Sequence, residues 1–98
     1  MIGVIVTFQY EDDFDRARVE KVAAEARPMF ESMPRVRNKF FTVNDDARRA
    51  RNFYAWESDE AARAFFSDQV PERVTDLYGV TPEIEFVEIV ELVDNSRS

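Results

Sequence analysis

The order in which the spacing of apolar residues changes along the chain restricts its fold more than any other feature. Apolar residues alternate at period two, then recur at helical spacing, alternate in two further stretches, recur at helical spacing again, and alternate once more near the C-terminus. The strands predicted from this order span residues 2–10, 36–43, 52–56 and 83–93. A right-handed crossover in each β-α-β half then gives an α+β fold, a split β-α-β antiparallel sheet of strand order 4-1-3-2 with both helices on one face.

Local signals predict where the helices begin and end. The first helix is expected over residues 13–33, and Pro28 should kink its last turn or mark its end, because proline lacks the N–H that a helix needs. Ser58 is placed to cap the second helix. Pro71 fits as the first residue of a short extra turn that ends at Gly79.

Length and composition then limit the class of protein. The chain has 98 residues, 45% of them apolar, which suits one domain, expected over 1–94, with a frayed tail at 95–98. It contains no Cys and no His, so thiolate nucleophiles, Ser-His-Asp triads and imidazole metal ligands are excluded. A net charge of -7 argues against nucleic acid and anionic lipid as partners. No apolar stretch approaches the roughly 20 residues of a membrane span, so we expect a cytoplasmic protein.

Apolar residues fall on both faces of the predicted sheet. One face is expected to carry Val4, Val6, Phe8, Phe40, Phe53, Ile84, Phe86 and Val90. The other is expected to carry Ile5, Phe41, Val43, Tyr54, Trp56, Val87 and Ile89. Helices can cover only one of these faces, and the other would exceed the ~300–600 Å² of a monomer's largest apolar patch. We therefore expect a two-fold homodimer with its sheets packed face to face. The alternative is a bulge in the third or fourth strand that exchanges the faces.

Several segments resemble a known family. Phe53–Ser58, running into an Ala- and Phe-rich helix, resembles the dimeric α/β-barrel superfamily, which has a ferredoxin-like fold. Arg27–Ser32 before Pro34, together with the Ser58–Ala62 helix start, is similar to small monooxygenases of the YdhR and antibiotic-biosynthesis monooxygenase type. The resemblance implies a homodimer and a pocket between each subunit's sheet and helices. For some relatives it implies cofactor-independent oxygenation of aromatic, polyketide-like substrates, with neither cofactor nor metal.

Two positions depart from that family. Haem-degrading relatives often carry a His early in the second helix, where this chain has Phe65 and Phe66. Haem degradation by a His-ligated iron is therefore excluded. Arg35 stands where a Gly usually follows the proline before the second strand, so that strand must begin with ordinary backbone angles.

Four residues are candidates for catalysis. Trp56 matches the aromatic residue of the family's pocket, and its indole can stack on a flat substrate while donating one hydrogen bond, although a core or interface role is the simpler explanation. Tyr54 can donate a hydrogen bond, and the Asn38 amide can orient a carbonyl or a peroxide-like oxygen. Glu88 shares its predicted face with apolar residues. There it would be a general base with a raised pKa, or the partner of an arginine from the first helix.

The cations of the second strand have a simpler explanation. Arg35, Arg37 and Lys39 alternate with less polar residues, which is a common protection of an exposed sheet edge. The polar run 44–51 is expected to be the hairpin connection after it.

Three functions remain open from the sequence. The first is a cofactor-free oxygenase of an aromatic small molecule, in which the substrate supplies electrons to O₂. The others are a module that binds an apolar aromatic ligand and a purely structural dimer. No catalytic set is complete, since the absence of His leaves the oxygenase without an obvious base.

Overall fold

The structure, a computed structural model, describes residues 1–67, 70–93 and 95. Its elements, in chain order, are β1 (Ile2–Gln9), α1 (Arg16–Glu31), β2 (Val36–Asn44), β3 (Arg49–Trp56), α2 (Asp59–Phe65), α3 (Val70–Tyr78) and β4 (Glu83–Glu88). Of the tail expected at 95–98, residues 96–98 lie outside the described residues.

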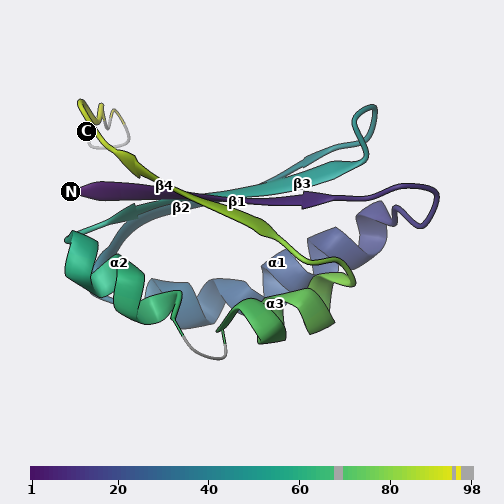
Figure 1. Ribbon diagram of the computed structural model, residues 1–98, viewed down its shortest axis with the longest axis horizontal. Coiled ribbons are helices and arrows are strands. Elements are labelled where there is room, and N and C mark those ends of the chain that lie inside the picture. Colours follow the sequence, from purple (N-terminus) through teal and green to yellow (C-terminus); the bar gives the residue numbers. More distant parts are fainter. Residues whose placement is uncertain (68–69, 94, 96–98) are drawn as a thin grey trace.

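The strands form one antiparallel sheet of order β2-β3-β1-β4, which confirms the predicted order. The three helices α1, α2 and α3 lie on one side of this sheet, and no helix of the described residues covers the other side (Figure 1). α1 packs beside β2 and α3, whereas α2 packs on β1 and β3. The α+β, ferredoxin-like architecture with helices on one face is therefore confirmed. No helix of the described residues is long and apolar enough to cross a membrane.

The first helix begins later and ends earlier than the expected range 13–33, whereas the second helix begins at its predicted cap. α1 begins at Arg16, because Asp15 adopts extended angles and its carboxylate accepts a hydrogen bond from the Arg18 backbone N–H at 3.3 Å. Pro28 lies inside α1, which continues to Glu31. The predicted Ser58 cap is present, with its hydroxyl accepting from the Ala61 N–H at 3.1 Å.

The extra turn expected after the second helix is a complete helix, α3. It ends at Tyr78, and the following Gly79 has a φ of 84°, in the left-handed region that favours glycine. The last strand is shorter than the expected range 83–93. It ends at Glu88, and residues 89–93 follow it without forming a strand.

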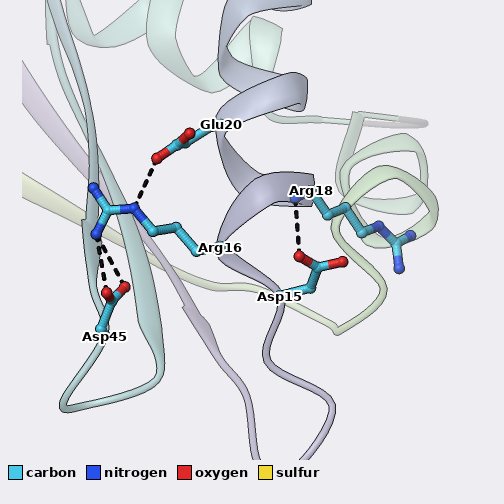
Figure 2. A network of polar contacts seen from close by, with 5 residues as sticks. All are labelled: Asp15, Arg16, Arg18, Glu20 and Asp45. Atoms are coloured by element: carbon cyan, nitrogen blue, oxygen red, sulfur yellow. Dashed lines mark hydrogen bonds and ion pairs between the residues drawn. The ribbon is translucent and has the colours of Figure 1, made fainter.

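Two arginines near the start of α1 anchor that helix to its neighbours (Figure 2). The Arg16 guanidinium donates to Glu20 at 2.7 Å and to both oxygens of Asp45 in the β2–β3 turn at 3.1 Å. Arg18 extends the other way, where its side chain donates to the backbone oxygens of Leu77 and Asp76 at the end of α3. The Arg16 bridge is solvent-exposed, so it orients the helix more than it stabilises the fold.

The registers correct the predicted sheet faces. β1 and β4 face as expected, with Val4, Val6 and Phe8 buried under the helices. The β2–β3 hairpin is inverted, because Val4 pairs with Tyr54 and Ile2 with Trp56. Residues expected on the bare face therefore lie under the helices: Phe41, Val43, Tyr54 and Trp56. Phe40 and Phe53, expected in the core, lie on the bare face, where Phe40 is 60% exposed.

A single bulge explains the inversion of β2. Pairing passes from Val36, opposite Trp56, to Asn38, opposite Ala55, so Arg37 is the extra residue. From that point Lys39, Phe41 and Val43 point toward the helices instead of away from them. The expected alternative was a bulge in the third or fourth strand, whereas the bulge lies in the second.

Candidate functional site

A groove lies between α1 and β2. Its volume is about 590 Å³, within the roughly 300–1,000 Å³ of small-molecule sites. Apolar and aromatic side chains form much of its lining, and polar groups are distributed among them. The lining comprises Ala23, Ala24, Arg27, Phe30, Glu31, Val36, Arg37, Asn38, Lys39 and Phe41.

Lys39 lies in this groove with its amine surrounded by aromatic rings. The Lys39 Nζ is 3.3 Å from the centroid of the Phe30 ring and 4.2 Å from those of Phe41 and Tyr54. It also donates a hydrogen bond of 2.7 Å to the Tyr54 hydroxyl. The expectation that Lys39 protects a solvent-facing sheet edge is therefore wrong, because the bulge turns this side chain inward.

Burial shifts the pKa values of the Lys39 amine and the Tyr54 hydroxyl. Desolvation lowers the pKa of Lys39 to about 6, so its amine loses its proton far more readily than the amine of an exposed lysine. The aromatic faces favour the ammonium form and oppose part of this shift. Burial, followed by the influence of Tyr78, raises the pKa of the Tyr54 hydroxyl, which stays protonated. The site thus places an amine of lowered pKa beside a neutral phenol.

Tyr54 connects the groove to a buried aromatic cluster. Its ring stacks on Trp56 with centroids 6.1 Å apart and meets Phe30 edge-on at 5.7 Å. Phe65 and Phe66 of the α2 region contact Trp56 at 5.1 and 6.0 Å. The Trp56 Nε1–H is buried and has no hydrogen-bond partner among the described residues. An unpaired buried donor costs about 1–3 kcal/mol, so this indole N–H is an unsatisfied polar group in the aromatic cluster behind the groove.

A second buried polar pair lies on the same side of the sheet. Asn52 is 4% exposed, and its Nδ2 donates to the Tyr78 hydroxyl at 3.2 Å. The Tyr78 ring stacks on Phe8 with centroids 3.8 Å apart, and its backbone oxygen accepts from the Tyr10 hydroxyl at 2.7 Å. Burial raises the pKa of Tyr78 against the opposing effect of the Asn52 bond. This pair ties α3 to the centre of the sheet.

The predicted site residues are only partly brought together. Tyr54 and Trp56 lie side by side under the helices, and Asn38 lines the groove next to Lys39. Glu88 does not join them. It lies at the end of β4 opposite Ile2, is exposed, and forms none of the ion pairs found among the described residues. The expected burial of Glu88 among apolar residues is wrong because the strand ends there.

Sequence reasoning missed Lys39 and Asn52. A detectable signal for Asn52 was the pair of arginines at 49 and 51, because two charged side chains in alternation place the intervening residues on the covered face. Lys39 gave no such signal, since the bulge that reorients it leaves no mark in the apolar pattern. Among the described residues no three carboxylates are grouped so that they could hold a metal ion.

Comparisons with known proteins show which solved structures share this fold. Neither protein-family models nor curated proteins gave a match. Among solved structures, NE2512, a protein of unknown function from Nitrosomonas europaea, superposes with a TM-score of 0.74 at 17% identity, covering 94% of this chain and 91% of that one.

Two further matches are oxygenases of Streptomyces. The monooxygenase ActVA-Orf6 of Streptomyces coelicolor, in complex with nanaomycin D, gives a TM-score of 0.68 at 19% identity, covering 94% of this chain and 89% of that one. SnoaB, a cofactor-independent oxygenase from Streptomyces nogalater, gives 0.69 at 16% identity, covering 94% of this chain and 95% of that one. The chain thus has the ferredoxin-like fold that is shared by monooxygenases of the antibiotic-biosynthesis type.

Proposed function

We propose that this protein is a cofactor-independent oxygenase that acts on an electron-rich aromatic small molecule bound between α1 and β2. The observation that carries the proposal is the groove of about 590 Å³, whose wall residue Phe30 packs on the buried Tyr54, which in turn stacks on Trp56 with its unpartnered Nε1–H. Flat aromatic ligands stack on such walls, and the few hydrogen-bonding groups orient them. The fold shared with ActVA-Orf6 and SnoaB supports the same class of reaction.

The proposed reaction balances without a redox cofactor. An anthrone-like substrate loses a proton from its CH₂ group, and the resulting anion gives its electrons to O₂ as a C–O bond forms. Loss of the second C–H proton then makes a C=O bond while the O–O bond breaks and water leaves. One CH₂ group and one O₂ give one C=O group and one H₂O. The protein contributes a dry pocket and positioned hydrogen bonds.

Oxygen uptake tests this function. A panel of anthrones and hydroquinones should consume O₂ faster with the protein than without it, and the Trp56→Phe variant should lower that rate because it removes the free indole N–H. A rate equal to the protein-free rate across the panel would contradict the oxygenase and favour a ligand-binding module.

We also propose that a second copy of the chain covers the bare sheet face. That face carries the apolar residues Ile5, Phe40, Phe53, Ala55 and Val87. Beside them, Arg49 and Arg51 of β3 and Glu83 and Glu85 of β4 line one shallow groove of about 240 Å³. A two-fold axis along the strands would bring the basic side of one copy toward the acidic side of the other. This self-complementary charge favours a homodimer over a different partner.

A further inference from the structure

The Lys39 amine is the one lysine amine that the fold removes from water. The chain contains two lysines, and the other, Lys21, is exposed on α1. The Lys39 Nζ lies against three aromatic rings and within 2.7 Å of the Tyr54 hydroxyl, yet its side chain lines the groove. A desolvated amine that small molecules can reach is the form in which lysine acts as a base.

The charges around Lys39 do not cancel this effect. From α1, Arg27 and Glu31 line the same groove and pair with each other, with Nε and Oε1 3.3 Å apart. From β2, Arg37 lines it as an exposed cation, and from β3 the neutral Tyr54 hydroxyl contacts the amine directly. No carboxylate pairs with Lys39 among the described residues. Among the described residues, the aromatic faces are therefore the groups that favour the charged form of the Lys39 amine.

We propose that the Lys39 amine is the base of the groove, which ionises a weakly acidic phenol or carbonyl-activated C–H group of the bound aromatic molecule. This inference rests on the proposed function and supplies the proton acceptor that a chain without histidine lacks. The Nζ lone pair takes the proton as the C–H or O–H bond breaks, and the electron pair stays on the substrate as an aromatic enolate or phenolate. The ammonium later returns its proton to the peroxide oxygen that forms on reaction with O₂.

Tyr54 is a positioning residue in this step. Its hydroxyl accepts one N–H of the amine, which leaves the nitrogen lone pair free for substrate. Replacement of Tyr54 by Phe keeps the ring that packs on Phe30 and Trp56 and removes only this hydrogen bond. It should lower kcat more than it raises KM and move the acidic limb of the pH profile, whereas a purely structural role would move neither limb.

Competitive amine labelling tests the state of Lys39 without any enzyme activity. Folded protein is reacted with a small acylating reagent from pH 5 to 10, and mass spectrometry compares labelling at Lys39 with labelling at Lys21. Labelling of Lys39 should level off near pH 7, whereas labelling of the exposed Lys21 should keep rising through the whole range. Parallel profiles for the two lysines would overturn the proposal, as would a Lys39 that stays unlabelled at every pH.

An anaerobic titration separates the base from the oxygenation. Anthrone is mixed with protein at pH 7 without O₂, and the absorbance of its enolate is recorded. Wild type and the Lys21→Met control should give the enolate, and Lys39→Met and Lys39→Arg should lose it. Enolate without oxygen uptake in air would contradict the oxygenase and leave the base intact. If both Lys39 variants keep the oxygen uptake of wild type, the role of Lys39 as base is contradicted while the oxygenase function stands. If Lys39 is the base, oxygen uptake by both variants should fall at least about 10²-fold.

Discussion

Replacing Lys39 by Met should stabilise the protein by an amount that falls as the pH rises. Met has a similar unbranched shape and fills the same space among Phe30, Phe41 and Tyr54 without an amine. In the folded wild type the pKa of Lys39 is lowered to about 6, whereas in the unfolded chain it returns to about 10.4. Between these two values the unfolded state binds one more proton than the folded state, so the wild type gains stability as the pH increases.

The magnitude follows from linkage. The cost of burying this amine is full below about pH 6 and absent above about pH 10.4, and it changes by up to about 1.4 kcal/mol per pH unit between them. Two pH units set a ceiling of about 2.8 kcal/mol, and the three aromatic faces reduce it, so the stability difference between Lys39→Met and wild type should shrink by about 2 kcal/mol from pH 7 to pH 9.

Urea denaturation at pH 7, 8 and 9 measures this difference, at one protein concentration because any dimer would add a concentration term. Lys21→Met is the matched control, since Lys21 is exposed and its variant should stay parallel to wild type. If Lys39→Met also stays parallel to wild type over this range, the amine is not desolvated and the reasoning from burial fails.

Three further outcomes are expected. Ser58→Ala should cost about 1 kcal/mol in thermal or urea unfolding, because the Ala61 N–H loses its cap, and an unchanged midpoint would contradict that role. Gly79→Ala should cost about 1 kcal/mol at the end of α3, since Ala is strained at a φ of 84°; equal stability would show that the turn adapts. Sedimentation of wild type should give a dimer and Phe40→Asp a monomer, and a wild-type species of 11.5 kDa at micromolar concentration would contradict the covered sheet face.

The strand order, the single covered face and the Ser58 cap could be predicted because each depends on local spacing or on one side chain. The faces of the hairpin could not, since Phe53 and Tyr54 are both aromatic and either suits a core. The arginines at 49 and 51 hold the missing information, but only if β3 is extended back to Arg49, whereas the expected strand began at residue 52. The position of Lys39 in the site could not be predicted either, because the bulge at Arg37 decides which way its side chain points.

The proline inside α1 affects the chemistry of the groove wall as well as the shape of the helix. Pro28 has no N–H, so the Ala24 carbonyl one turn earlier lacks the donor that an ordinary residue would give it. Ala24 is one of the residues that line the groove. The groove wall therefore contains a backbone carbonyl to which residue 28 cannot donate, in addition to the polar side chains of Glu31 and Asn38. If the groove binds the proposed aromatic ligand, a hydroxylated ring that reaches this carbonyl would gain a hydrogen bond that a plain hydrocarbon cannot form.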